Sequence, residues 1–206
     1  QRNNTSHMLF KVDELIADYG VKVIGVAGDL SQQAVAEATI KAATDHFGRI
    51  DVLVNNAGGG ILRPFLDHTP DTLKATIDRN LWPCIWCCWY ALPPMRAQGY
   101  GRIVNLGADS VRNGLFDHAA YNAAKGGMHG MTTGLAREYA RVGITVNTVA
   151  PCVVQTPQLD EVARRDPELV RKVIDVVQMG RPGTMDEVAS MVAYLASREA
   201  AFVTGQ

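Results

Sequence analysis

The stretch Ile50–Gly60, IDVLVNNAGGG, begins as a run of apolar, β-branched residues and then changes to asparagine, alanine and glycine. The first part is typical of a strand that is buried on both faces of a sheet. The second part cannot continue that strand, because glycine weakens a strand interior and asparagine favours turns. The stretch therefore predicts a buried strand that ends in a loop of small residues.

Strand-like and helix-like runs alternate on both sides of this stretch. Besides the strand that begins at Ile50, we expect strands at Val21–Ala27, Gly101–Gly107 and Ile144–Pro151. We expect helices at about Lys11–Asp18, from a cap at Ser31 to Phe47, from Thr69 and Pro70 with breaks to about Ala97, at about Ala119–Val142 and within Thr184–Ser197. Continuous apolar strands that alternate with helices are typical of a parallel sheet covered on both faces. The sequence therefore predicts one α/β domain with a doubly wound parallel sheet.

The size and charge of the chain argue against binding to nucleic acid or to a membrane. The chain has 206 residues, of which 47% are hydrophobic, enough to bury the core of one soluble globular domain. Its 20 basic and 21 acidic residues are mixed along the sequence, so we expect no basic face that would bind nucleic acid. The longest apolar run, Leu81–Met95, is interrupted by prolines and is shorter than the roughly 20 residues that a membrane helix needs. The N-terminal sequence QRNNTSHMLF does not resemble a signal segment. We expect no membrane partner and a cytoplasmic location.

The cysteines and histidines do not form a metal-binding pattern. Cys84 and Cys87 have a C-x-x-C spacing, but they lie with Cys88 in one apolar helical run, and no second pair follows. We therefore interpret the four cysteines, Cys152 included, as packing residues rather than as metal ligands or redox groups. The five histidines are scattered, and we assign no metal site.

Ligands of doubly wound sheets bind beyond the carboxyl ends of the strands. Here the segments that follow the strands are Asp29–Leu30, Asn55–Gly60, Gly107–Ser110 and Ala150–Pro157. Their small residues let a ligand approach the backbone closely, and their asparagines supply uncharged donors and acceptors. One such loop is readily explained as a simple turn, whereas several at one sheet edge favour a binding site.

A second stretch, His118–Gly127 or HAAYNAAKGG, places a phenol and an ammonium group on one helix face. Residues four apart on a helix, here Tyr121 and Lys125, are roughly 5 to 6 Å apart at Cβ. A free tyrosine has a pKa of about 10 and is hardly ionised at neutral pH. A cation at about 4 Å, at an effective dielectric constant near 20, contributes about 4 kcal/mol, on the order of three pKa units before desolvation of the lysine is subtracted. We therefore expect the pair to lower the pKa of Tyr121 enough to make it a usable base, although in isolation such a pair also suits a solvated helix face.

Several motifs occur together in a known order. NNAG follows the strand at Ile50–Val54, an asparagine stands at position 80, and YNAAK and GITVNTVAP follow farther along. With this order and spacing, the chain from Lys11 to Gln206 resembles the short-chain dehydrogenase/reductase family. The resemblance implies a Rossmann-like fold, hydride transfer between a secondary alcohol or ketone and NAD or NADP, and assembly as a homodimer or homotetramer.

The resemblance also implies roles for individual residues. Tyr121 would transfer the proton, Lys125 would tune the phenol and bind the cofactor ribose, and Asn80 would hold a water molecule in a proton relay. The implied contacts of the nicotinamide dinucleotide are Asp29, Leu30, Asn56, Ala57, Gly58, Tyr121, Lys125, Pro151, Val154 and Thr156.

Two residues depart from the family pattern. The family usually has a serine thirteen residues before the tyrosine, where it binds the substrate oxygen, and this position is Ala108. Loss of one such donor costs about 10² to 10³ in rate. In an extended segment Ser110 would point the same way as residue 108, so we expect Ser110 to act as a catalytic residue in its place. The usual glycine after the strand proline is Cys152, which we interpret as a packing change.

The start of the family pattern is missing. No strand, glycine-rich turn and helix precede Lys11, so the element that cradles the cofactor phosphates is not in the sequence. The first two strands of the family, and its usual last strand after Phe202–Gln206, are missing too. Since the first strand would lie between Val21–Ala27 and Ile50–Val54, we expect residues 1–206 to be a fragment of a single dinucleotide-binding oxidoreductase domain that lacks its first strands. The residue that selects NAD or NADP would lie in the missing part.

The run Leu81–Met95, LWPCIWCCWYALPPM, is apolar nearly all round, as is typical of a helix buried in the core or against another subunit. Together with Arg63–Phe65 it looks like the branch of the family that oxidises cis-dihydrodiol carboxylates in aromatic catabolism. On that interpretation Arg63 or Arg112 would hold the carboxylate, although a surface salt link also explains each arginine. The alternative functions are reduction of a 3-oxoacyl thioester on an acyl-carrier protein, and a truncated, non-catalytic interaction subunit.

Overall fold

A parallel sheet forms the centre of the molecule. The computed structural model describes residues 2–206, with side chains from Lys11 onward. The strands β1 (Val52–Asn55), β2 (Gly101–Leu106) and β3 (Ile144–Val149) form a three-stranded sheet in the order β1-β2-β3, with β2 parallel to both neighbours. All three strands were predicted from the sequence, and the predicted α/β fold with a parallel sheet is confirmed.

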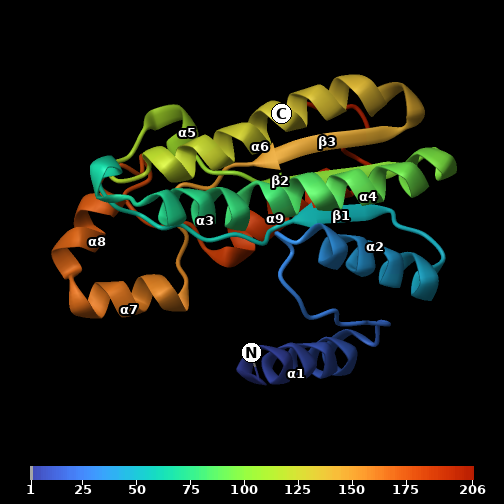
Figure 1. Ribbon diagram of the computed structural model, residues 1–206, viewed down its shortest axis with the longest axis horizontal. Coiled ribbons are helices and arrows are strands. Elements are labelled where there is room, and N and C mark those ends of the chain that lie inside the picture. Colours follow the sequence, from blue (N-terminus) through green and yellow to red (C-terminus); the bar gives the residue numbers. More distant parts are fainter. Residues whose placement is uncertain (1) are drawn as a thin grey trace.

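Helices cover both faces of this sheet (Figure 1). The helices of residues 2–206 are α1 (Arg2–Tyr19), α2 (Gln33–Phe47), α3 (Pro70–Asn80), α4 (Trp82–Gln98), α5 (Ser110–Asn113), α6 (Ala119–Tyr139), α7 (Pro157–Arg165), α8 (Pro167–Ile174) and α9 (Met185–Ala196), with single 3-10 turns at Phe65–Asp67 and Ala140–Val142. Of these, α1, α7 and α8 lie apart from the sheet (Figure 1). Ile103 of β2 packs with residues of α2, α4 and α6 on one face, whereas Val104 packs with Leu195 of α9 on the other. Successive residues of a strand point to opposite faces, so these two clusters are the two layers of a doubly wound domain.

Local signals placed most helix ends correctly. Thr69 and Thr184 each begin a helix with a reciprocal capping box, and the predicted helices start at both places. Helix α2 ends at Gly48, which has the left-handed conformation that favours glycine. The predicted cap at Ser31 is wrong, because the residue before α2 is Gln32, and the backbone N–H of Ser31 instead donates a 2.9 Å hydrogen bond to Oδ1 of Asp29.

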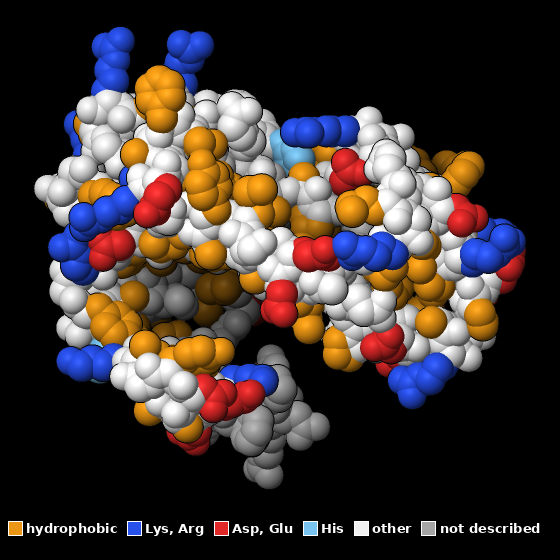
Figure 2. Space-filling view, turned by 180° about the vertical axis from the view of Figure 1, so that it is seen from behind, with side chains coloured by type: hydrophobic (Ala, Val, Ile, Leu, Met, Phe, Trp, Pro, Cys, Tyr) orange, Lys and Arg blue, Asp and Glu red, His pale blue; other side chains and the backbone are white. Residues whose placement is uncertain are grey.

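The predicted strand at Val21–Ala27 is also wrong. This segment is extended chain between α1 and α2, and no strand among residues 2–206 pairs with it. A strand needs a hydrogen-bonded neighbour, and β1 is bonded on the side of β2 only. Figure 2 shows the molecule hollowed beside α1, with hydrophobic side chains in the hollow. The valines Val52 and Val54 of β1 remain 41% exposed.

The cysteines lie partly as predicted. Cys84, Cys87 and Cys88 of α4 are buried, and burial raises the pKa of Cys87 to about 11, so these thiols are packing residues. Cys152 is exposed, and the prediction that it is a packing residue is wrong for this position. No helix in the described part of the chain is long and apolar enough to cross a membrane, and those residues contain no cluster of three or more potential metal-binding side chains.

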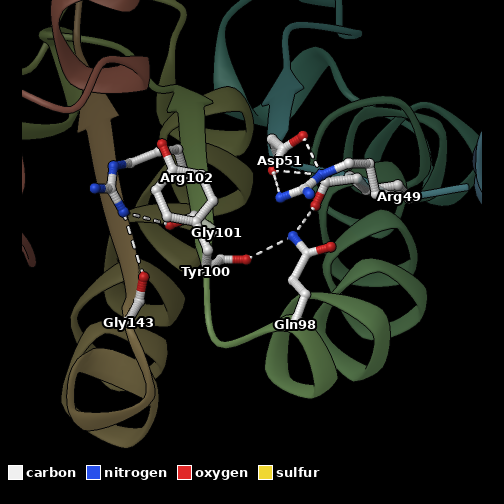
Figure 3. Close-up of polar contacts among 8 residues, drawn as sticks. Arg49, Asp51, Gln98, Tyr100, Gly101, Arg102 and Gly143 are labelled. Atoms are coloured by element: carbon white, nitrogen blue, oxygen red, sulfur yellow. Dashed lines mark hydrogen bonds and ion pairs between the residues drawn. The ribbon is translucent and has the colours of Figure 1, made fainter. Parts of the chain in front are cut away.

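Polar contacts join the segments at the amino end of the sheet, opposite the predicted site (Figure 3). Nε2 of Gln98 donates to the carbonyl oxygens of Ile50 and Tyr100, which lie before β1 and β2. The guanidinium group of Arg102 is buried, stacks on the Tyr100 ring at 4.4 Å, and donates to the carbonyl oxygens of Gly101, Gly143 and Ser197. These carbonyls belong to the starts of β2 and β3 and the end of α9, so one cation holds three segments together.

We predict that Arg102→Leu destabilises the protein by about 2 to 4 kcal/mol, because it removes the donor from three carbonyl groups at a buried site. Urea unfolding measures the loss. Arg49→Leu, which breaks only the exposed ion pair with Asp51, is the matched control and should change stability much less. Equal losses in the two variants would contradict this assignment.

Candidate functional site

Three adjoining pockets lie at the carboxyl ends of the strands. The Asp29 pocket, of about 380 Å³, is lined by Gly28, Asp29, Leu30, Ala57, Gly58, Gly59, Arg79 and Pro83. The Lys125 groove, of about 670 Å³, shares Gly58 and Gly59 with it. The Ser110 pocket, of about 310 Å³, shares Gly107, Tyr121, Pro151 and Val154 with the groove. The shared residues make the three pockets one continuous site.

Tyr121 and Lys125 come from the first turns of α6 and face the same site. Nζ of Lys125 lies 5.8 Å from the centroid of the Tyr121 ring, and it donates a 2.6 Å hydrogen bond to the carbonyl oxygen of Leu106 at the end of β2. Lys125 is only 4% exposed, whereas Tyr121 is half-buried and lines both the groove and the Ser110 pocket. The phenol therefore stands at the junction of two binding spaces.

The expected lowering of the pKa of Tyr121 is not seen in this structure. Burial raises the pKa of Tyr121 and lowers the pKa of Lys125, because each charged form loses water contacts. The ammonium group is hydrogen-bonded to a carbonyl rather than to the phenol, and its attraction at this separation does not offset desolvation. The pKa lowering expected from the sequence assumed that the ammonium group lies about 4 Å from the phenol.

Asn80 holds the loop that follows β1. Its side chain is fully buried at the end of α3, where Nδ2 donates to the carbonyl oxygens of Gly59 and Thr76 at 2.9 and 2.8 Å. Oδ1 of Asn80 accepts a hydrogen bond from the Gly59 N–H at 3.1 Å. Both backbone groups of Gly59 are thus fixed by one side chain, and Asn80 positions the loop rather than lining a pocket.

The floor of the groove requires glycine at position 58. A Cβ atom added there would lie 2.8 Å from Oδ1 of Asn80 and 3.5 Å from Nζ of Lys125. Gly58 therefore lets the backbone run closely past both side chains while its outer surface stays open to a ligand. This open, small-residue floor fits a nicotinamide dinucleotide, which needs a long site with close backbone approach.

The structure brings the predicted cofactor residues together. Asp29, Leu30, Ala57 and Gly58 line the first pocket, and Asn56, Gly58, Tyr121, Lys125, Pro151, Val154 and Thr156 line the groove. The Asp29 carboxylate accepts from the Ser31 N–H, and this hydrogen bond is the main reason that its pKa is lowered.

The predicted orientation of Ser110 is wrong. Ser110 begins the short helix α5, and Asp109 is already helical. The rule that residues 108 and 110 point the same way in an extended segment therefore does not apply. Ser110 still lines its pocket beside Ala108 and Tyr121, but its hydroxyl donates a 2.6 Å hydrogen bond to Oδ1 of Asn122 on α6. The O–H group of Ser110 is thus already donated to Asn122.

Two histidines were missed by the sequence analysis. The N–H of Ala108 donates to Nε2 of His129, and burial lowers the pKa of His129, which favours the neutral ring that can accept this bond. His118 lines the Ser110 pocket, and its ring lies edge-on to Tyr121 with centroids 5.8 Å apart. The spacing of three residues between His118 and Tyr121 at the start of a helix could have indicated this contact. Neither Arg63 nor Arg112 lines any of the three pockets.

Known proteins resemble the chain over nearly its whole length. A family model described as Enoyl-(Acyl carrier protein) reductase matches residues 3–206. The 2,3-dihydroxy-2,3-dihydro-p-cumate dehydrogenase of Pseudomonas putida is 60% identical over 194 residues, which cover 94% of this chain and 75% of the relative. The 1,6-dihydroxycyclohexa-2,4-diene-1-carboxylate dehydrogenase of Acinetobacter baylyi is 34% identical, over 90% of this chain and 75% of its own length.

A solved structure agrees with the fold. The crystal structure of levodione reductase superimposes with a TM-score of 0.85 and 32% sequence identity, and the match covers 95% of this chain and 78% of that one. The family model, the close relatives and the solved structure all point the same way. The chain belongs to the short-chain dehydrogenase/reductase family, and it is an oxidoreductase that uses NAD or NADP.

Proposed function

We propose that the protein oxidises a cis-dihydrodiol that carries a carboxylate on its ring, and so forms a catechol in aromatic catabolism. The relatives at 60% and 34% identity are named for dihydroxy-cyclohexadiene carboxylates or a dihydroxy-dihydro-cumate. The observation that carries the proposal is the position of Tyr121, which lines both the Lys125 groove and the Ser110 pocket. A diol in the pocket and a cofactor in the groove would both reach the phenol.

The proposed chemistry divides between the cofactor and three side chains. The nicotinamide ring, when bound, takes up the hydride from the alcohol carbon. Tyr121, as the phenolate that the Lys125 ammonium group stabilises, accepts the proton of the same hydroxyl group and becomes the neutral phenol. Asn80 fixes Gly59 and connects the phenol to solvent through a water molecule. Asp29, Leu30, Asn56, Ala57, Gly58, Pro151, Val154 and Thr156 complete the proposed cofactor site.

We further propose that residues 1–206 form a single dinucleotide-binding domain which acts in the cytoplasm as a homodimer or homotetramer. The unpaired segment Val21–Ala27 and the free edge of β1 support a further strand between them. On α4, Trp89 is 68% exposed and lines a surface pocket of about 720 Å³ with Tyr90 and Tyr139. Large apolar side chains exposed together on a helix surface support a subunit interface there.

We predict that Tyr121→Phe lowers kcat for diol oxidation by about 10² to 10⁴, because the variant has no group to accept the proton. The assay follows formation of reduced cofactor with a panel of cis-dihydrodiols and simple alcohols, and consumption of reduced cofactor with 3-oxoacyl thioesters. Tyr139→Phe, at the far end of α6, is the control and should retain activity. Turnover of thioesters alone would favour the reductase alternative, and turnover of nothing in the panel would favour a non-catalytic subunit.

We predict that Lys125→Met moves the alkaline rise in kcat/KM for diol oxidation to higher pH. The ammonium group, 5.8 Å from the centroid of the Tyr121 ring, favours the phenolate, so its removal raises the pKa of Tyr121 further. The pH profile of kcat/KM measures the shift. Lys125→Arg keeps the charge and should keep the position of the rise; an unchanged profile in Lys125→Met would refute the role of the charge.

We predict that Ser110→Ala lowers kcat by about tenfold, less than the loss of a fully free donor, because the hydroxyl is shared with Asn122. Steady-state turnover of the diol measures the change. Ser190→Ala on α9, where the hydroxyl bonds only to the Glu187 carbonyl, is the matched control. Unchanged turnover in Ser110→Ala would show that this hydroxyl does not replace the one missing at Ala108.

A further inference from the structure

The Ser110 pocket has both apolar and polar walls and contains one side chain that can carry a positive charge. Leu62, Leu115 and Pro151 contribute apolar walls, and Ser110, Tyr121 and His118 contribute polar groups. A carboxylate that enters such a pocket loses hydration and must find a charged or strongly donating partner. Among the described side chains that line this pocket, only the imidazole of His118 can become a cation.

Three arginines around the site and the site lysine do not line the Ser110 pocket. Arg181 lines the neighbouring pocket that shares Pro151 with this one, but it donates to both carboxylate oxygens of Glu187 at 2.9 and 2.6 Å. Lys125 faces the groove and bonds to the Leu106 carbonyl. Arg63 and Arg112 do not line the pocket. Charge recognition of a substrate in this pocket therefore depends on His118.

Local contacts hold the His118 ring in one tautomer. Its Nδ1 atom lies 2.6 Å from the carbonyl oxygen of Phe116, which can only accept, so Nδ1 carries a proton, and in the cationic ring the second N–H, at Nε2, is left to donate to a ligand. The chain turns at Asp117, whose φ of 66° lies in the left-handed region, and the Asp117 carbonyl accepts from the Arg63 N–H at 3.1 Å. This turn places the Phe116 carbonyl beside the ring.

The position of His118 also suits an anion next to the reacting phenol. Its ring is edge-on to Tyr121 with an interplanar angle of 81°, so both rings border the same space. His118 is the residue before α6, a helix of 21 residues, and the N-terminal end of a helix dipole favours negative charge. The apolar walls leave room for the ring of the substrate beside these two polar groups.

We propose that His118 binds the ring carboxylate of the substrate through Nε2 and so selects carboxylated cis-dihydrodiols over diols that lack the carboxylate. The inference rests on the proposed diol dehydrogenase function. His118 touches the substrate in this arrangement, but it exchanges no proton with the reacting hydroxyl group, which is the task of Tyr121. Its substitution should therefore change KM far more than kcat.

The test compares two substrates in the full-length enzyme: a cis-dihydrodiol of benzoate, and the cis-dihydrodiol of benzene, which has no carboxylate. In His118→Gln we expect KM for the carboxylated diol to rise about 10- to 100-fold, with KM for the other diol and both kcat values within about twofold. Arg63→Gln and Arg112→Gln are the controls and should leave both KM values unchanged. An equal rise of KM for both diols, no rise, or a selective rise in either arginine variant overturns the proposal.

Product binding gives a second readout. Dissociation constants of 2,3-dihydroxybenzoate and of catechol are compared in wild type and in His118→Asn, a variant that keeps a good helix-capping residue. The proposal expects the variant to lose affinity for the carboxylated product only, and equal losses overturn it. A wild-type enzyme that oxidises neither diol would overturn the proposed function itself, whereas one that oxidises both without preference would overturn only the role of His118.

Discussion

The hydrogen bond from Nζ of Lys125 to the carbonyl oxygen of Leu106 fixes the geometry on which the site depends. It ties the first turns of α6 to the carboxyl end of β2, and Tyr121 lies one turn earlier on the same helix. The phenol is thereby held over the sheet edge, between the groove and the Ser110 pocket. Asn80 fixes the loop after β1 through both backbone groups of Gly59. Two buried polar side chains thus hold the two segments that border the groove.

Burial of Tyr121 and Lys125 disfavours the phenolate and the ammonium group, the two charged forms that catalysis needs. Desolvation raises the pKa of Tyr121 and lowers the pKa of Lys125, so each charged form is less stable here than in water. A phenolate forms readily only if the ammonium charge acts on it through a medium from which water is largely excluded, where Coulomb attraction is stronger. Ligands that fill the groove and the pocket would supply that exclusion. Proton transfer to Tyr121 therefore depends both on the charge of Lys125 and on ligands that exclude water from the site.

Features that depend on a few neighbouring residues were predictable, and features that depend on distant partners were not. The helix starts at Thr69 and Thr184 and the three strands β1, β2 and β3 follow from local pattern, and so does the placement of Tyr121 and Lys125 on one helix face. The segment Val21–Ala27 has the composition of a strand, but a strand also requires a neighbour, and composition does not reveal one. The Ser110 hydroxyl was misplaced because the chain turns into a helix at Asp109. The helical spacing of His118 and Tyr121 could have indicated that their rings are in contact, but the pocket that both residues line is evident only from the fold.

The central claim is that, when ligands fill the site, the positive charge of Lys125 lowers the pKa of Tyr121 enough for the phenolate to act as a base. The most direct measurement is an NMR titration of the full-length enzyme labelled with ¹³C at the tyrosine ζ carbon, with the Tyr121 signal assigned from the Tyr121→Phe variant and NAD present at saturation. The account predicts that this signal titrates below the pKa of about 10 of a free tyrosine. A Tyr121 signal that titrates above that value with cofactor bound would contradict it.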